Sequence, residues 1–337
     1  MTARGAYFRL HRGVSAVARE LGTEVDLLRS RNGRADLALF HEFAPPPTGG
    51  GHQFLRALLG EFERRGLTVE LNRISRGTSV CLFNSFNFDF RRLRRFARSG
   101  VRFVHRVDGP IATYRGFDDG TDGRISEVNR ALADSTIVQS RYSLDAHRAL
   151  GIELTDPRLV VNTVDPSVFH PPAAREPLVG RRVRVIATSW SDNPNKGSDV
   201  VSWLDANLDH ERYEVAFAGQ TSEALTHVRA LGAIPTDAVA EELRRNDLYL
   251  APSRNDPCSN ALLEALASGL PAAFRASGGH PELVGEGGLP FDSPEEVPAV
   301  LDRLVSELDE RRAAIRMSSV TDVADRYLDV LGIGASA

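Results

Sequence analysis

Lysine is almost absent from this sequence, because 40 of its 41 basic residues are Arg and Lys196 is the only Lys. Cysteine is also scarce, and Cys81 and Cys258 offer neither a disulfide framework nor the spacing of a metal site. No apolar run is long enough to cross a bilayer, and the N-terminus lacks the apolar core of a signal peptide. We therefore expect a cytoplasmic enzyme with reduced thiols.

Charge is distributed unevenly along the 337 residues. Residues 1–170 carry 25 Arg against 19 Asp and Glu, a net charge of +6, whereas residues 171–337 have a net charge of −10. The positive first half indicates an anionic partner. The whole chain, at −4, lacks the basic excess of a nucleic-acid-binding protein, so we expect no nucleic-acid partner.

Strand patterns alternate with helix patterns along most of the chain, which is typical of parallel sheets covered by helices on both faces. The alternation breaks at 169–177, FHPPAAREP, which we interpret as a linker. The sequence thus predicts an α/β protein with two doubly wound, Rossmann-like domains, 1–170 and 171–337, that face each other across a cleft. Residues 1–34, with a helix near 12–21, form an extension without an assigned role. The last predicted helix, 311–331, is a candidate for returning to the first domain.

These predictions define the elements by their residue ranges. The predicted strands are 37–43, 69–73, 80–84, 101–107, 136–139, 159–162, 183–188, 213–218, 247–251 and 272–275. The predicted helices are 52–65, 88–98, 125–133, 142–150, 198–207, 222–231, 237–245, 260–268, 295–308 and 311–331.

The stretch 252–271, PSRNDPCSNALLEALASGLP, predicts a loop followed by a helix with Ser259 or Asn260 as its N-cap. Glu264 is the only charge on this helix, and Ala and Leu surround it. A helix that is apolar on every side is buried, and buried carboxylates are usually paired or functional. Asp256 lies in the loop at the helix mouth, where free N–H groups favour an anion such as phosphate.

Four polar or glycine-rich clusters follow predicted strands, and ligands of doubly wound sheets bind beyond the carboxyl ends of the strands. Lys196 supplies a compact cation that, with a helix N-terminus, suits a diphosphate without a metal. Asp256 and Glu264 can accept hydrogen bonds from sugar and ribose hydroxyls. The set therefore suits transfer from a sugar nucleotide. The clusters are Gly49-Gly50-Gly51, the run from His105 through Asp108 to Pro110, the run from Ser191 to Gly197, and the run from Asp256 to Glu264.

Residues 253–271 resemble the donor-binding segment of GT-B glycosyltransferases of the retaining family 4 (glycosyl transferases group 1), which has an acid, seven intervening residues and a Glu. Four further segments are similar to motifs of that family in the same order. They are ADSTIVQS at 133–140, VNTVD at 161–165 with FHP at 169–171, NKG at 195–197 and GGHPELV at 278–284.

The resemblance implies a retaining transferase that needs no metal and no cofactor beyond the nucleotide-sugar donor. Lys196 would contact the diphosphate, Glu264 the ribose and Asp256 the sugar. The helix start, Ser259, Asn260 and Ala261, and the glycines 49–51 would complete the donor site. His105 and Asp108 would act from the first domain near the reacting carbon or the acceptor, which is an unidentified glycan, lipid-linked molecule or small molecule.

Two residues depart from the family pattern. Asp256 stands where Glu is usual, and Ser191 stands where an Arg usually precedes the Lys by five residues. Arg254 or Arg275 would compensate for that missing cation. A sugar-nucleotide epimerase of the same fold stays open as an alternative, as does a degenerate protein that binds a nucleotide sugar without transferring it. A phosphorylase would need a pyridoxal-phosphate lysine, and Lys196, which precedes a glycine in a donor loop, argues against it.

Structural interpretations stand beside some of these functional ones. His105, at the end of a strand, is alternatively a satisfied core residue, and 49–51 alone is as consistent with a flexible connection. The helix 88–98 carries five Arg side chains, which predict either a solvated face or peripheral contact with an anionic membrane. The five are Arg91, Arg92, Arg94, Arg95 and Arg98.

Overall fold

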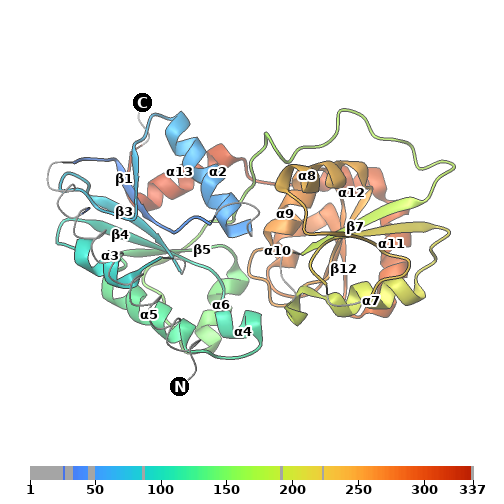
Figure 1. Ribbon diagram of the computed structural model, residues 1–337, viewed down its shortest axis with the longest axis horizontal. Helices are drawn as coiled ribbons and strands as arrows, with labels where there is room; N and C mark the ends of the chain where they lie inside the picture. The colour runs from blue at the N-terminus through green and yellow to red at the C-terminus, as the bar shows by residue number, and fades with distance from the viewer. Residues whose placement is uncertain are drawn as a thin grey trace, which may run out of the picture.

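The computed structural model describes residues 26, 33–44, 50–85, 88–189, 193–221 and 224–334. It contains two six-stranded sheets in which every paired strand runs parallel, each with helices packed against it (Figure 1). The predicted α/β fold with two doubly wound domains is therefore confirmed. The predicted helix near 12–21 and the candidate residues Gly49 and Ser191 lie outside the described residues.

The N-terminal sheet has the strand order β2-β1-β3-β4-β5-β6. Apolar residues fill its central strands, and all four residues of β1 are buried, as a sheet covered on both faces requires. The strands are β1 (Leu37–Phe40), β2 (Val69–Leu71), β3 (Val80–Asn84), β4 (Arg102–Val107), β5 (Ser135–Val138) and β6 (Pro157–Leu159). The helices are α2 (Gly50–Arg64), α3 (Phe90–Phe96), α4 (Ile111–Arg115), α5 (Thr121–Leu132) and α6 (Arg141–Ala149).

The C-terminal sheet has the order β12-β11-β10-β7-β8-β9. Apolar clusters on both of its faces bury the helices that follow each strand. The strands are β7 (Val183–Ser189), β8 (Tyr213–Gly219), β9 (Arg229–Gly232), β10 (Leu248–Ala251), β11 (Ala272–Arg275) and β12 (Gly288–Phe291). The helices are α7 (Ser198–Asn207), α8 (Thr236–Arg245), α9 (Asn260–Ala267), α10 (His280–Val284), α11 (Val297–Ser306) and α12 (Leu308–Ala314).

The segment predicted as one helix, 311–331, consists of two helices, α12 and α13 (Val320–Leu331). Ser319 caps α13: its hydroxyl accepts a hydrogen bond from the backbone N–H of Asp322, and the Asp322 carboxylate accepts one from the backbone N–H of Ser319. This capping box starts a new helix at Ser319. α13 lies beside α2 and buries Tyr327 and Leu331 in the core of the N-terminal domain (Figure 1). The chain therefore passes between the domains twice.

The helix predicted at 222–231 is wrong, because residues 229–232 form the edge strand β9. The carboxylate of Asp205, on α7, accepts hydrogen bonds from the backbone N–H groups of Thr226, His227 and Val228 at 2.7–3.0 Å. These bonds occupy backbone N–H groups that would otherwise form the hydrogen bonds within a helix. The contact comes from a residue about twenty positions away, so local helix propensity could not reveal it.

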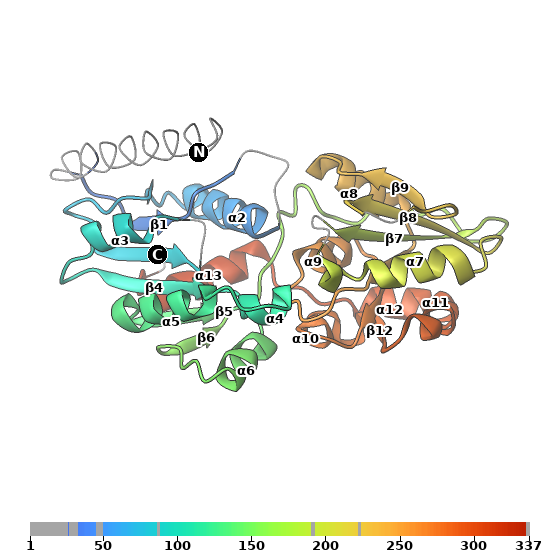
Figure 2. The same ribbon diagram turned by 60° about the horizontal axis from the view of Figure 1, so that its bottom comes forward.

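The two domains touch where the N-terminus of α2 meets the N-terminus of α9 (Figure 2). Gly50, the first residue of α2, lies so close to Asn260 that a Cβ on Gly50 would overlap the Cβ of Asn260. Gly60, in the same helix, has open space at the corresponding position. The close approach of the Gly50 backbone to the Asn260 side chain therefore requires a glycine at position 50, whereas nothing near Gly60 requires one there.

This difference predicts opposite effects for two Gly→Ala substitutions in α2. Gly60→Ala should raise the free energy of unfolding by about 0.5–1 kcal/mol, because Ala loses less backbone entropy in a helix. Gly50→Ala should lower it by roughly 1–3 kcal/mol through overpacking at the domain contact. Urea denaturation of both variants measures this, and equal stabilisation by both would contradict the close approach.

Candidate functional site

Two adjoining cavities, of about 90 and 260 Å³, lie between the domains at the carboxyl end of the C-terminal sheet. The amide of Gln53, on α2, donates to the hydroxyl of Thr236, on α8, at 3.1 Å and so joins the domains beside them. This is the edge of a doubly wound sheet where ligands bind. Both cavities are lined by Gly50, Gln53, Phe169, Thr236 and Glu264.

Glu264 faces these cavities from α9. Ser259 caps the helix by accepting a hydrogen bond from the backbone N–H of Leu262, as the sequence predicted. The Glu264 side chain is only 8% exposed, and no described group donates a hydrogen bond to its carboxylate. Burial raises the pKa of Glu264 to about 8. The site thus holds a buried acceptor without a donor.

Lys196 and Asp256 form an ion pair on the other side of the α9 N-terminus, with 2.9 Å between Nζ and Oδ2. Burial alone would lower the pKa of Lys196, but the Asp256 carboxylate outweighs it and holds the pKa above its usual range. Burial would likewise raise the pKa of Asp256, and the Lys196 charge holds it below its usual range. Both groups are therefore charged at neutral pH. The ring of Tyr114, from α4 of the other domain, lies 5.0 Å from Nζ.

The loops that carry this pair are shaped by two glycines. Gly197 adopts a φ of +84° and packs against the backbone of Pro252, and Gly278 adopts a φ of +66° and packs against the backbone of Asp256. A side chain at either position would be strained and would push the loop away. The Lys196 loop is also held across the domain boundary, because the Asn195 amide donates to the Tyr114 carbonyl at 2.8 Å.

The start of α9 also contacts the N-terminal domain. Asn162 donates from its amide to the Asn260 side-chain oxygen at 3.1 Å, and Gly50 abuts the same residue. Ala261 lines the smaller cavity. Gly51 lies in the first turn of α2, with open space beside its Cα. Of the predicted donor-binding residues that the structure describes, Gly50, Asn260, Ala261 and Glu264 line the cavities, whereas Gly51, Lys196 and Ser259 do not.

The structure does not bring His105 to the cavities. Its side chain is 0% exposed, stacks on Phe83 with 4.1 Å between the ring centres, and contacts the Asn129 amide at 3.1 Å. Burial lowers the pKa of His105 to about 3, so the ring is neutral. Side chains alternate across a strand, and His105 points into the helix layer on the far side of β4 from its neighbour Arg106.

Arg106 is the residue at this strand end that sequence reasoning missed. Its buried guanidinium donates to the side-chain oxygens of Asn84 at 2.8 Å, Asp108 at 2.9 Å and Asn162 at 3.1 Å. Through Asn162 it reaches Asn260 at the start of α9. The fragment HRVDGP contains the signal that could have identified Arg106, because a charged residue within a buried strand needs a partner, and Asp108 follows two residues later.

Asp108 lies at the domain boundary, with 27% of its side chain exposed. It accepts hydrogen bonds from the Ser85 hydroxyl and from Arg106, both at 2.9 Å. The next residue, Gly109, packs against Pro257 of the loop that carries Asp256. Asp108 is therefore the predicted first-domain residue that lies beside the C-terminal domain.

A histidine pair was also missed. His41, which follows β1, contacts His52 of α2 with 2.9 Å between Nε2 and Nδ1. Burial, and then the neighbouring His52, lowers the pKa of His41 to about 3, and burial also lowers the pKa of His52, so both rings are neutral and one donates an N–H to the other. The pair holds the first turn of α2, which supplies Gly50 and Gln53 to the cavities.

Arg254 and Arg275, the expected substitutes for the missing arginine, both bind Asp199 in the first turn of α7, at 2.7 and 3.0 Å. Within the described residues, no three His, Cys, Asp or Glu side chains form a group that could hold a metal ion. None of the described helices is both long enough and apolar enough to span a membrane.

The raised pKa of Glu264 predicts a pH-dependent stability. The native state keeps the proton up to about pH 8, whereas the unfolded chain releases it near pH 4.5, so stability falls as the pH rises between these values. Glu264→Gln removes this loss. The variant should gain up to about 1.4 kcal/mol over the wild type for each pH unit in that window.

Glu61 provides the matched control. Hydrogen bonds from Arg64 lower the pKa of Glu61 to about 2, so both its folded and unfolded forms are ionised above pH 5.5. The stability difference between wild type and Glu61→Gln should therefore stay constant from pH 5.5 to 8. Denaturant titrations at several pH values measure both differences, and a flat Glu264→Gln difference would show that Glu264 is ionised in the folded protein.

Comparison with known proteins places the chain by family and by fold. Residues 204–307 match the model of the family described as glycosyl transferases group 1. No curated protein matches the sequence.

Solved glycosyltransferase structures share the fold at low identity. Sucrose-phosphate synthase from Thermosynechococcus elongatus is 15% identical, with a TM-score of 0.64 over 88% of this chain and 94% of that one. WaaG, a glycosyltransferase involved in lipopolysaccharide biosynthesis, is 14% identical, with a TM-score of 0.62 over 88% and 100%. Anabaena HepE, solved with UDP and glucose, is 14% identical, with a TM-score of 0.61 over 88% and 95%. The chain is therefore a glycosyltransferase that carries the group 1 family domain in residues 204–307 and has the GT-B fold.

Proposed function

We propose that the protein is a retaining, metal-independent glycosyltransferase that moves a sugar from a nucleotide diphosphate to an acceptor. The observation that carries this proposal is the arrangement around the start of α9. A cation, Lys196, lies on one side of the helix N-terminus, and Glu264, a buried carboxyl group to which none of the described residues donates, faces the interdomain cavities on the other.

The donor would lie across this helix start. Ribose hydroxyls would donate to Glu264 and so satisfy the buried carboxylate. The base would enter the smaller cavity between Gly219, at the end of β8, and Ile234. The diphosphate would lie against the N–H groups of α9 and against Lys196, where anions are favoured. Asp256 would then face the sugar. Because HepE was solved with UDP and glucose, UDP-sugars are the donors to test first.

In the proposed reaction the acceptor oxygen attacks the anomeric carbon on the face from which the leaving group departs. The bond between that carbon and the phosphate oxygen breaks, and the acceptor proton passes to the leaving phosphate. The protein then needs no nucleophile of its own and contributes by positioning and by stabilising the diphosphate charge. Asp108 is the first-domain group that we place nearest the acceptor, since its carboxylate lies at the domain boundary beside Ser85.

Substitution of the two donor-side groups tests the proposal. Lys196→Ala should weaken donor binding by about 10- to 100-fold, the value of one charge-assisted hydrogen bond of roughly 1.5–3 kcal/mol, and Glu264→Gln should weaken it by about 2- to 10-fold, the value of one uncharged hydrogen bond of roughly 0.5–1.5 kcal/mol. Calorimetry against UDP-, GDP- and dTDP-sugars measures the affinity, and transfer assays on the same donors measure turnover.

Two controls accompany these variants. Lys196→Ala leaves Asp256 buried without its partner, so the double variant Lys196→Ala/Asp256→Asn separates lost donor contact from lost folding. Arg303→Ala, on the exposed face of α11, removes a cation far from the site and should change nothing. Wild-type donor affinity in both site variants would refute the site assignment. Nucleotide-sugar binding without turnover for any acceptor would favour a degenerate binding protein, and turnover into an isomeric sugar nucleotide would favour an epimerase.

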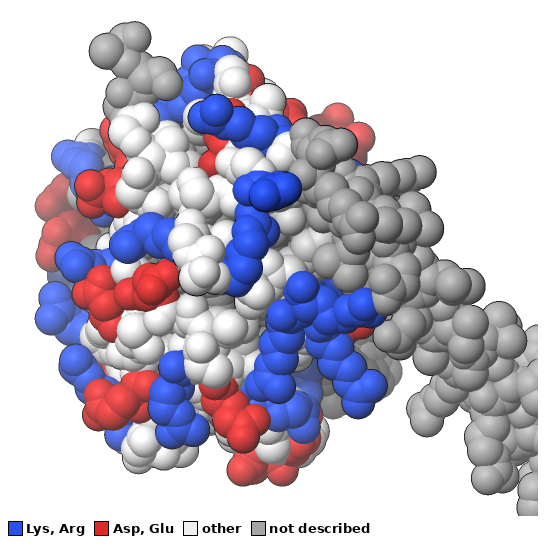
Figure 3. Space-filling model, turned by 90° about the vertical axis from the view of Figure 1, so that its left-hand side faces the viewer, with Lys and Arg blue, Asp and Glu red and all other residues white. Residues whose placement is uncertain are grey.

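We retain peripheral contact with an anionic membrane through α3 as part of the proposal. Two of the five arginines of segment 88–98 serve the fold, because Arg92, on α3, donates to the Asn72 carbonyl, and Arg98, just after α3, donates to the carbonyls of Ser75 and Thr78. The side chains of Arg91, Arg94 and Arg95 are exposed. Figure 3 shows basic side chains gathered in one part of this end of the molecule, with mixed charge elsewhere on the face.

Liposome flotation distinguishes this contact from a solvated surface. Wild-type protein should float with vesicles that contain anionic lipid and should stay behind with neutral vesicles. Arg91→Gln/Arg94→Gln should lose roughly 2 kcal/mol of binding, about 1 kcal/mol for each charge near the surface. Arg92 is left intact because it supports the fold. Failure of the wild type to float with anionic vesicles would end the membrane hypothesis.

A further inference from the structure

A third cavity, of about 650 Å³, lies at the end of the C-terminal domain opposite the proposed donor site. Arg184, the second residue of strand β7, and Asp247, which precedes β10, both line it, so it sits at the amino ends of these parallel strands. The interdomain linker forms another wall, since 172–176 also line the cavity. Figure 1 shows this linker running along the outside of the domain before β7 begins.

Five arginine side chains line the cavity, against three carboxylates, in a half of the chain whose net charge is −10. Such a surplus of two positive charges is unusual for an acidic domain, and it is concentrated around a single hollow. The arginines are Arg175, Arg181, Arg184, Arg244 and Arg245, and the carboxylates are Glu176, Glu241 and Asp247.

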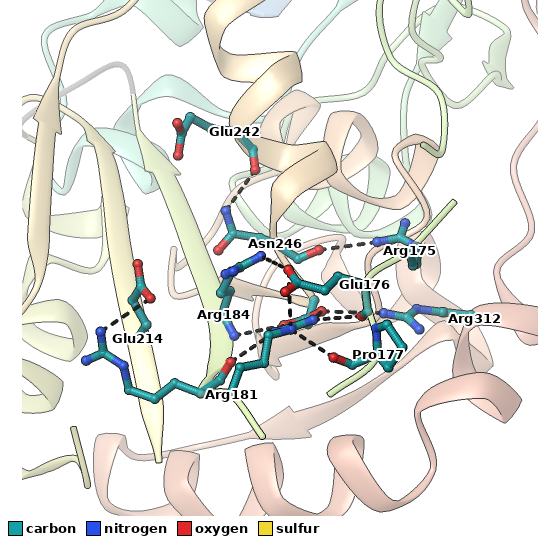
Figure 4. A network of polar contacts seen from close by, with 11 residues as sticks. Arg175, Glu176, Pro177, Arg181, Arg184, Glu214, Glu242, Asn246 and Arg312 are labelled. Carbon is teal, nitrogen blue, oxygen red and sulfur yellow. Dashed lines mark hydrogen bonds and ion pairs between the residues drawn. The ribbon is translucent and has the colours of Figure 1, made fainter. Parts of the chain in front are cut away.

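Arg181 neutralises Asp247, the buried carboxylate of the cavity. Its guanidinium binds both oxygens of Asp247, at 2.7 and 2.8 Å, and the backbone N–H of Arg184 donates to the same carboxylate at 2.9 Å. Glu176 in turn pairs with the Arg184 side chain at 2.8 Å. These two acids therefore have little capacity left for the other arginines. Figure 4 shows Arg184 reaching the cluster from one side and Arg175 and Arg312 from the other.

Arg175 and Arg244 pair with no carboxylate among the described residues. Arg175 donates to the carbonyls of Ser268, Gly269 and Asn246, and Arg244 donates to the carbonyl of Val168. Burial, and then the charge of Arg312, lowers the pKa of Arg175 to about 10. Asp247 offsets part of this effect but is itself paired with Arg181, so an anion added beside Arg175, whose hydrogen bonds all go to neutral carbonyls, would stabilise its charged form.

We propose that this cavity binds a phosphate group, either inorganic phosphate or a phosphomonoester, with Arg175 and Arg244 as its charged donors. A phosphate dianion matches the surplus of two charges, and guanidinium groups bind phosphate oxygens in pairs. The site does not depend on the proposed transfer reaction. A bound phosphate would tie the linker, through Arg175, to α8, through Arg244, at one of the two places where the chain passes between the domains.

Calorimetric titration with sodium phosphate at constant ionic strength tests the site. The titration uses the Lys196→Ala/Asp256→Asn protein, so that phosphate at the proposed donor site does not contribute. A single saturable site is expected, and Arg175→Gln/Arg244→Gln should weaken it at least about tenfold, as loss of two charge-assisted contacts requires. Arg229→Gln/Arg303→Gln, two arginines outside the cavity, is the matched control and should bind like its parent.

Arg175 also holds the end of α9, so the double variant needs a test of folding. If it loses cooperative unfolding, Arg244→Gln alone, whose side chain bonds one carbonyl, should still weaken phosphate several-fold. A parallel titration with glucose 6-phosphate identifies the source, since tighter binding than phosphate assigns the site to a phosphomonoester and weaker binding assigns it to the free ion. Absence of saturable binding of either probe overturns the proposal, as does binding that the cavity variants leave unchanged.

Discussion

The site depends on one buried guanidinium. Arg106 lies at the end of β4, where it joins Asn84 and Asp108 to Asn162, which follows β6. Asn162 in turn contacts Asn260, the first residue of α9. Removal of a buried charge from its partners is costly, so this network fixes how the carboxyl ends of the two sheets face each other. The cavities, Glu264 and the Lys196 loop all lie around that junction.

Burial raises the pKa of both acids near α9, but only Asp256 has a cation that reverses this effect. Asp256 has Lys196 at 2.9 Å and is ionised, whereas Glu264 has no donor among the described residues and holds its proton to about pH 8. The same low-polarity surroundings therefore produce a permanent ion pair and an unsatisfied acceptor a few residues apart in the chain. The first is stable without a ligand, and the second gains most from one that brings hydroxyl groups.

Sequence reasoning succeeded where a property is local. The start of α9 at Ser259 and the burial of Glu264 follow from a capping residue and an all-apolar helix, and both are present. It failed where a distant contact decides the outcome. Asp205 holds the backbone before β9 in an extended form, and the capping box at Ser319 divides the predicted last helix.

The candidate site shows the same limit. The strand that ends in HRV was identified, but His105 and Arg106 point to opposite faces of the sheet, each covered by helices of the same domain. Which of the two packs under α2, the helix that contacts α9, depends on tertiary packing, so His105 was predicted instead of Arg106. The pairing of Lys196 with Asp256 was also beyond reach, because an ion pair between two loops is set by how the loops pack.

The position of α13 has a consequence for synthesis on the ribosome. Its Tyr327 and Leu331 complete the core beneath α2, yet they are made only after the whole of the other domain. The first domain to emerge is therefore the last to be finished, and until then it exposes the apolar groove that α13 fills. The second domain, whose core is complete by α12, can fold earlier and wait for it.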